Sequence, residues 1–160
     1  MQRFIGTKII QAEPMSEFEF AASMGKETPQ NDNQHGWKVQ YPDGYISWSP
    51  KKAFMEAYRR TDNMNFGLAI EAMLKGKKVA RRGWNGKNMF TVYMSPLNLP
   101  PFNTQGTNRK VNDRTAKWIG EDTPLESLGY FAMFTADKKW QPGWLASQTD
   151  MLAEDWEILD

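Results

Sequence analysis

The feature that most constrains the fold is a short helical pattern followed directly by two β-prone runs. Apolar residues recur at helical spacing after Asn65, which suits an N-cap, and Gly76 is placed to end the helix in the left-handed conformation. The runs 77–82 and 89–94 are typical of strands, and the glycine-rich segment 83–88 between them is typical of a turn. Because a helix stripe and a sheet face must each be buried, the pattern predicts an α+β fold with a helix packed on an antiparallel β-sheet.

A second pattern precedes this one along the chain. Alternating residues at 37–41 and 45–48 flank the turn sequence Pro42-Asp43-Gly44, which predicts a β-hairpin. Ser49-Pro50 then suits the cap and the first residue of a helix that runs to Arg60. We therefore expect a small ββα-like module before the helix-on-sheet domain.

The boundary between the two patterns is predicted at the polar segment 61–63. The first module then covers residues 1–62, and the second domain covers residues 63–160. Within the second domain, the proline-bounded and polar stretch 95–129 predicts an inserted arm or binding loop, with a short helix at 112–119.

Shorter patterns complete the first module. A β-prone run at 4–12 is expected to end at Pro14, and Ser16 has the spacing of a capping box for a brief helix. The polar segment 25–36 predicts a loop, in which we expect His35 to be exposed to solvent.

The C-terminal residues alternate between strand and turn patterns. A strand is expected at 130–135, and its partner begins at Trp140 and is confined to a sheet edge by Pro142. A one-turn helix is expected at 152–155, and the run 156–159 can complete the sheet.

Composition excludes several kinds of site. The chain has 20 Lys and Arg residues, 19 Asp and Glu residues and a formal charge of +1, so no overall field attracts it to nucleic acid or to an anionic membrane. It has no Cys and one His, which excludes disulfides, Cys-ligated zinc and paired-His catalysis. No apolar run approaches the roughly 20 residues of a spanning helix, and no signal-peptide core begins the chain. We therefore expect a soluble protein of the cytoplasm.

The densest cluster of polar and aromatic residues is the segment 81–87. Its glycines allow a ligand to approach the backbone, its cations can bind phosphate and its indole can stack on a base. A β-turn with solvated charges and one core tryptophan explains the same pattern equally well, so both interpretations stay open. The candidate ligand-binding residues are Arg81, Arg82, Trp84, Asn85 and Lys87.

A second polar cluster follows Trp144. Its hydroxyl, amide and carboxylate groups suit ribose hydroxyls or a purine edge. Taken alone, the segment favours a simpler interpretation, in which Ser147 or Thr149 with Asp150 caps the short helix that follows. The candidate residues of this cluster are Ser147, Gln148, Thr149 and Asp150.

An enzyme hypothesis rests on Asp150, Glu154 and Asp155. Carboxylates four residues apart share a helix face and could hold Mg²⁺, but acidic residues in a first helical turn are also stabilised by the helix dipole. No His, Cys or third acidic segment completes a metal site, and Ser147 has no general base for a catalytic triad. We therefore predict that the protein is not an enzyme, with no metal and no cofactor.

Several segments of the second domain form a recognisable set of motifs. They are Met64-Asn65-Phe66-Gly67, Lys75-Gly76-Lys77-Lys78-Val79, GWNGK at 83–87 and WLASQTDMLAEDW at 144–156. Together these segments, over about residues 64–160, resemble the second type of phage Thoeris anti-defence protein, formerly a domain of unknown function. The leading sequences FIGTKII at 4–10 and YPDGYISWSPK at 41–51 look like a separate phage-associated module.

The resemblance implies a sponge, which binds cyclic ADP-ribose-type signals from a bacterial TIR defence enzyme without cleaving them and so keeps the Thoeris effector inactive. It also implies binding of cyclic di- or trinucleotides from CBASS systems, a homotetramer with pockets between protomers, and action in the cytoplasm of the infected bacterial host. No DNA or membrane partner is implied. The residues agree with such a ligand if Trp84 and the segment 147–150 converge on one cavity. Two alternatives stay open: a metal-dependent phosphodiesterase acting on the same signals, and a phage nucleic-acid-binding accessory protein.

Overall fold

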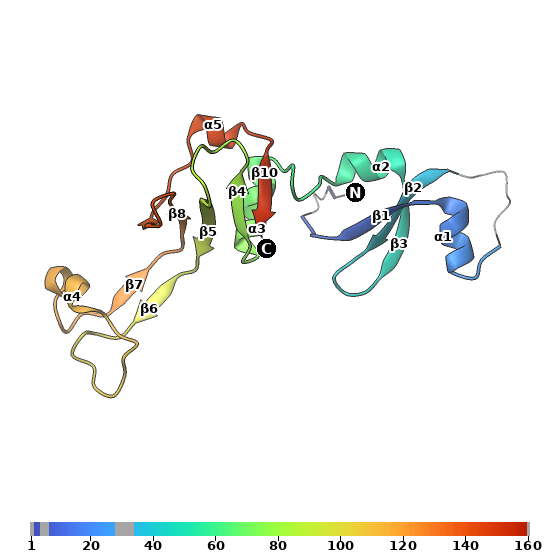
Figure 1. Cartoon of the computed structure of the whole chain (residues 1–160). Helices are drawn as coiled ribbons and strands as arrows, with labels where there is room; N and C mark the ends of the chain where they lie inside the picture. Colours follow the sequence, from blue (N-terminus) through green and yellow to red (C-terminus); the bar gives the residue numbers. More distant parts are fainter. Residues whose placement is uncertain (1, 4–6, 28–33, 160) are drawn as a thin grey trace. The chain divides into compact units, whose positions relative to one another are not determined.

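The chain folds into two compact units, residues 1–60 and residues 61–160, each with its own core. The structure is a computed structural model that describes residues 2–3, 7–27 and 34–159 (Figure 1). Its helices and antiparallel sheets form an α+β fold, which confirms the predicted fold class. None of the described helices is long and apolar enough to cross a membrane.

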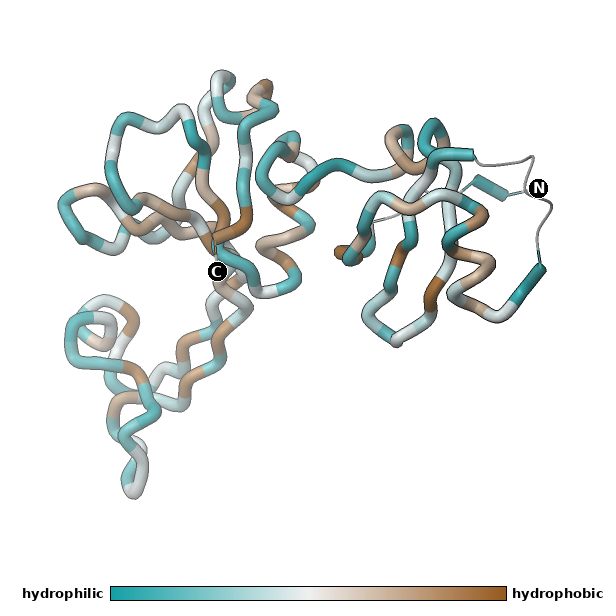
Figure 2. The backbone as a smooth tube through the Cα atoms, turned by 45° about the vertical axis from the view of Figure 1, so that its right-hand side comes forward, coloured by the Kyte–Doolittle hydropathy of each residue, from teal (hydrophilic) through white to brown (hydrophobic). Residues whose placement is uncertain are grey.

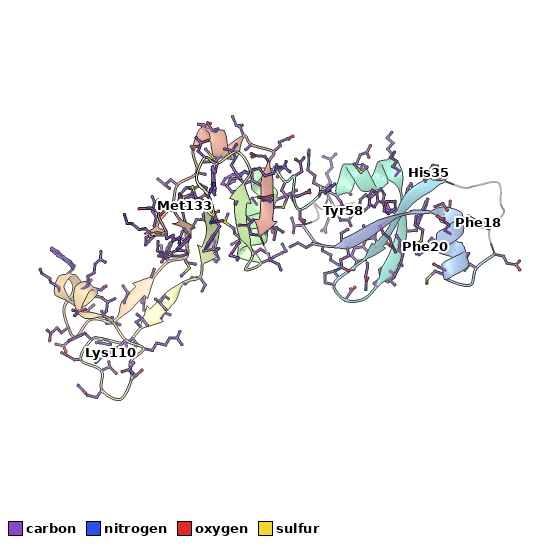
Figure 3. All side chains as sticks on the ribbon, in the orientation of Figure 1. Phe18, Phe20, His35, Tyr58, Lys110 and Met133 are labelled. Carbon is purple, nitrogen blue, oxygen red and sulfur yellow. The ribbon has the colours of Figure 1, made fainter. Side chains whose placement is uncertain are left out.

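The first unit is a three-stranded antiparallel sheet with two helices. The hairpin is confirmed, because Gln40 pairs with Ile46 across the predicted turn. Trp37 of the hairpin stacks on the buried Phe54, with ring centroids 4.7 Å apart, and Tyr58 (Figure 3) extends this aromatic core. The elements, in the sheet order β1-β2-β3, are β1 (Gln11–Ser16), β2 (His35–Gln40), β3 (Ile46–Pro50), α1 (Glu17–Ser23) and α2 (Lys51–Ala57).

Three local predictions for this unit need correction. β1 continues through Pro14 instead of ending there, since an edge strand tolerates a residue without an N–H, and residues 4–6 of the predicted run lie outside the described residues. His35 is exposed as expected but begins β2 instead of lying in a loop (Figure 3). The N-cap of α2 is Pro50, with no side-chain cap from Ser49, and the helix ends at Ala57 instead of Arg60, because Tyr58 is extended. The capping box at Ser16 is confirmed.

The second unit carries the predicted helix on an antiparallel sheet (Figure 1). Asn65 caps the helix by accepting a 3.0 Å hydrogen bond from the Leu68 N–H, and Gly76 follows it with φ +79°. The predicted edge strand that begins at Trp140 is also confirmed. The helix is α3 (Phe66–Leu74), and the strands, in the order β10-β4-β5-β8-β9, are β10 (Trp156–Leu159), β4 (Lys78–Arg81), β5 (Phe90–Met94), β8 (Tyr130–Phe134) and β9 (Trp140–Pro142).

The core of this unit lies between α3 and the sheet, where apolar segments gather (Figure 2). Ala69 and Met73 on the helix meet Val79 on β4 and Trp156 on β10, and each is at most 1% exposed. Trp156 is the largest of these side chains, and its ring N–H donates to the Asp150 carbonyl at 3.0 Å. The core therefore ties the C-terminal strand to the segment just before it.

The stretch 95–129 contains more structure than the sequence predicts. The helix α4 (Asp113–Ile119) is confirmed, with Asn112 as its cap. The strands β6 (Leu97–Leu99) and β7 (Leu125–Ser127) pair with each other and were not expected, because three-residue strands beside prolines give almost no periodic signal. Val111 is 1% exposed and follows Lys110 (Figure 3), whose ammonium lies over the Phe102 ring.

The one-turn helix near the C-terminus lies earlier than predicted. It is α5 (Gln148–Met151), and not 152–155. Ser147 is its N-cap, because the Ser147 hydroxyl accepts from the Asp150 N–H at 3.1 Å while the Asp150 carboxylate accepts from the Ser147 N–H. The sequence-level assignment was wrong because it treated the capping residues as an irregular turn.

Candidate functional site

The two predicted polar clusters meet at one end of the five-stranded sheet. β10 pairs with β4 in antiparallel register, so Trp156 lies opposite Arg81. This pairing places the segment before β10, which includes α5, beside the loop that follows β4. Residues 66 positions apart in the sequence are thereby joined by one hydrogen bond, from the Trp84 ring N–H to the Asp150 carboxylate at 2.9 Å.

Arg81 occupies the centre of this region. Its Nε donates to an Asp155 oxygen at 2.8 Å and its Nη1 donates to an Asp150 oxygen at 3.0 Å, while the side chain is 12% exposed. The hydrogen bond that Arg81 donates to Asp155, together with the charge of that carboxylate, raises the pKa of the Arg81 guanidinium, and the same hydrogen bond lowers the pKa of the Asp155 carboxyl. Because both carboxylates already hold this guanidinium, Arg81 positions the two segments relative to each other.

Asp150 accepts more hydrogen bonds than any simple helix cap requires. One oxygen accepts from Trp84 and Arg81, and the other accepts from the hydroxyl of Ser147 at 2.7 Å. Burial alone would raise the pKa of the Asp150 carboxyl, but the hydrogen bonds from Trp84, Ser147 and Arg81 outweigh it and lower the pKa to about 2. The carboxylate is therefore ionised over the whole physiological range.

Trp84 is a structural residue as well as a candidate ligand-binding one. Its half-buried ring packs edge to face on Trp156, with centroids 5.3 Å apart, and on Trp144, with centroids 6.1 Å apart. The interpretation of Trp84 as a core tryptophan in a β-turn is therefore correct for the part of the ring that packs on Trp144 and Trp156. Sequence reasoning missed Trp144 and Trp156 as its supports, although they bound the 144–156 segment.

The glycines of the loop after β4 are explained by packing. The Gly83 N–H donates to Asp155 at 2.7 Å, and a Cβ at Gly83 would lie 2.7 Å from the same carboxylate oxygen. A Cβ at Gly86 would overlap the sulfur of Met89 and lie 2.8 Å from the Ala136 methyl carbon. Both glycines therefore let the loop pack close to its neighbours. From the sequence alone, this role could not be distinguished from close approach of a ligand.

The remaining predicted residues are exposed around this network. Arg82 donates to the Asn63 side chain at 2.9 Å. Among the described residues, the other four side chains find no hydrogen-bond or ion-pair partner, and their polar groups are open to solvent. These four residues are Asn85, Lys87, Gln148 and Thr149.

The proposed magnesium site loses its geometric basis. α5 ends at Met151, so Asp150, Glu154 and Asp155 do not share a helix face, and the enzyme hypothesis, which the sequence already disfavoured, loses that premise. Asp150 and Asp155 are both paired with Arg81, and their other oxygens accept hydrogen bonds from the Ser147 hydroxyl and the Gly83 N–H. Within residues 2–3, 7–27 and 34–159, no three His, Asp or Glu side chains are grouped as metal ligands.

The fold and this network define a small α+β domain of the helix-on-antiparallel-sheet class, preceded by a separate unit. Residues 64–159 match the family model of the Thoeris anti-defense 2-like domain. The Thoeris anti-defense 2 protein of Bacillus phage SP01 is 38% identical over 96 residues, which cover 60% of this chain and 94% of that protein. The chain belongs to the Thoeris anti-defense 2-like family, as the resemblance predicted. The matched region contains all the candidate ligand-binding residues and lies outside the first unit.

Proposed function

We propose that this protein is a phage anti-defence sponge that binds cyclic ADP-ribose-type signals and keeps them from the Thoeris effector. Family membership supports the anti-defence role, since the relative in phage SP01 carries that name. The observation that carries the ligand proposal is the hydrogen bond between Trp84 and Asp150, which brings an indole and a polar helix start together. A cyclic ADP-ribose isomer offers a purine face, a diphosphate and several hydroxyls to such a site.

Each part of the proposed ligand has a matching group. The half-buried Trp84 ring would stack on the purine with the part that solvent reaches. Arg82 and Lys87 carry cations outside the Arg81 network and suit the diphosphate, while the exposed groups of Asn85 and α5 suit the hydroxyls. In this assignment Arg81 and Asp150 act indirectly, because they hold the loop against α5 before the ligand arrives.

Capture requires no bond to be broken in the signal. It requires only a dissociation constant below the signal concentration and protein in excess over signal. The pairing of Asp150 and Asp155 with one guanidinium disfavours the phosphodiesterase alternative, since neither carboxylate is left to coordinate a metal or to act as a base. The protein would act in the cytoplasm of the infected host, where the signal is made.

Assembly into a homotetramer is a further part of the proposal. Four large apolar side chains of the second unit are strongly exposed, and contacts between protomers would cover apolar surface of this kind. They are Trp118 (81%), Leu128 (86%), Leu145 (88%) and Leu152 (79%). Light scattering after size-exclusion chromatography measures the number of protomers, and a monomer at micromolar concentration would contradict this part. Cyclic di- or trinucleotides of CBASS would bind at a separate site of the assembly, which competition with the first ligand tests.

The decisive experiment distinguishes capture from cleavage. The protein is incubated with cyclic ADP-ribose isomers, removed from free ligand and heat-denatured, and the supernatant is analysed by mass spectrometry. Release of intact ligand supports capture, whereas a linear product supports the phosphodiesterase and contradicts the proposal. Salt-sensitive binding of DNA, with no nucleotide retained, would favour the accessory-protein alternative.

A matched pair of lysine variants tests whether the binding is local. Lys87→Ala removes a cation from the candidate site, and Lys77→Ala removes an exposed lysine at the other end of β4. Lys87→Ala should weaken binding, measured by calorimetry, while Lys77→Ala should leave it unchanged. Equal effects of the two variants would contradict the proposed position of the site.

A further inference from the structure

The turn between β8 and β9 holds a lysine in a conformation that suits glycine. The Lys138 N–H donates to the Thr135 carbonyl and the Thr135 N–H donates to the Lys139 carbonyl, both at 2.9 Å. Lys138 has φ +61°, in the left-handed region. Hairpin turns of this kind usually have glycine or asparagine at that position, because a Cβ there meets the following carbonyl. A lysine in this unfavourable conformation therefore suggests that its side chain has a function.

This turn touches the loop that carries the candidate site. A Cβ built on Gly86 would lie 2.8 Å from the methyl carbon of Ala136, so the backbone of Gly86 lies close to the Ala136 side chain and the two turns are in contact. They adjoin because the start of β5 and the end of β8 are paired neighbours in the sheet. Lys87 follows the contact residue in one turn, and Lys138 lies two positions after it in the other. Two flexible cationic side chains therefore start from turns that touch.

The charges of the turn leave Lys138 available. Asp137 accepts from Lys139 Nζ at 2.6 Å and from the Thr135 hydroxyl at 2.5 Å, so its charge is already matched within the turn. In the described ranges of the chain, the Lys138 ammonium has neither an ion-pair nor a hydrogen-bond partner, and the same holds for Lys87. Two unmatched cations therefore extend from adjoining turns, a combination that suits the doubly charged diphosphate of a compact nucleotide.

We infer that Lys138 is a phosphate-binding residue of the candidate site and binds, together with Lys87, the diphosphate of the captured cyclic nucleotide. The inference rests on the proposed function and extends it to a turn that neither the sequence clusters nor the Arg81 network includes. It also accounts for the left-handed lysine, because glycine at this position would relieve the backbone and remove the ammonium.

The test uses the left-handed conformation of Lys138, because a glycine there removes the charge without disturbing the fold. Lys138→Gly removes the cation while fitting φ +61° better than lysine, so its melting temperature should equal or exceed that of the wild type. Its affinity for cyclic ADP-ribose isomers, measured by calorimetry on the full chain, should fall about tenfold, as expected for one hydrogen bond to a charged group. Lys138→Arg should retain the affinity, and Lys139→Ala, which removes a paired cation of the same turn, should change it little.

Each outcome decides one question. If the wild type binds and Lys138→Gly binds equally well, the role of Lys138 is refuted while capture stands. If Lys139→Ala weakens binding as much as Lys138→Gly, the effect is one of general charge and the inference fails. If the wild type retains none of these nucleotides, the proposed function and the inference fall together.

Discussion

Trp48 in the first unit and Trp84 in the second use the same indole donor for different purposes. Trp48 of β3 donates to the Met15 carbonyl of β1 at 2.8 Å. Its ring passes over Gly36 on the intervening strand, where a Cβ would collide with it. Trp84 donates instead to the Asp150 carboxylate at 2.9 Å. Both rings are half-buried, but one joins two edge strands and the other joins a loop to a charged network.

The comparison shows that the acceptor of the indole hydrogen bond determines whether the bond only stabilises the fold or also connects to charged groups. A backbone carbonyl has no charge to lose, so the Trp48 contact serves the fold at any pH. The Asp150 carboxylate is shared by Trp84, Arg81 and Ser147, so a change at any one of them acts on the others. The first unit therefore has a packed sheet, whereas the second unit has a sheet and a preorganised polar surface.

The largest expected effect comes from breaking the charged network itself. Arg81→Met leaves Asp150 and Asp155 without their guanidinium and should lower the free energy of unfolding by about 3 kcal/mol. Lys38→Met removes an exposed pair with Glu13 in the first unit and should cost roughly 0.5 kcal/mol. Urea unfolding followed by tryptophan fluorescence measures both. Equal losses of unfolding free energy in the two variants would show that the charge pairs of the two units contribute equally to stability.

The next largest effect is expected from acid, which should reduce stability through Asp150 of the second unit. The folded-state pKa of Asp150 is about 2, below the ordinary 3.8, so its ionised form stabilises the folded state above pH 4. That contribution, about 2 kcal/mol, is lost as the pH falls from 4 towards 2. Thermal unfolding at pH 6 and pH 2 should therefore show a smaller pH effect in Asp150→Asn than in the wild type. The control Asp113→Asn, which removes an exposed carboxylate at the start of α4, is measured in the same way.

The two indole donors can be compared directly by replacing each with phenylalanine. Trp84→Phe removes a hydrogen bond to a charged group and should destabilise by about 2 kcal/mol, and it should also weaken nucleotide binding. Trp48→Phe removes a hydrogen bond to a neutral carbonyl, should cost about 1 kcal/mol and should leave binding intact. Calorimetry and denaturant unfolding check the pair, and the comparison is refuted if Trp48→Phe impairs binding as much as Trp84→Phe.

The smallest effects concern the two capping boxes. Ser16→Ala and Ser147→Ala each remove a helix cap and should each cost about 1 kcal/mol of stability. Only Ser147→Ala frees Asp150 to move, so only this variant should also reduce affinity for the nucleotide. Loss of affinity in Ser16→Ala would contradict the assignment of the site to the second unit.

The fold was predictable where the signal is local. Asn65 and Ser16 were identified as caps because the hydrogen bonds they make stay within one turn of helix. The hairpin and the antiparallel sheet followed from alternation and turn residues. The paired strands β6 and β7 were missed, since their three-residue lengths carry no period. The position of α5 was predicted too late in the chain, because its capping sequence also matches an irregular turn.

The residue types of the site were determined by the sequence alone: an indole, cations, hydroxyls and carboxylates in two short segments that match one family. Their roles were decided by tertiary structure. Arg81 meets Asp150 and Asp155, which are 69 and 74 positions away, only because β10 pairs with β4. Local sequence specifies which groups are present, but charge pairing and burial depend on neighbours that are distant in the chain, and only the folded sheet brings them together.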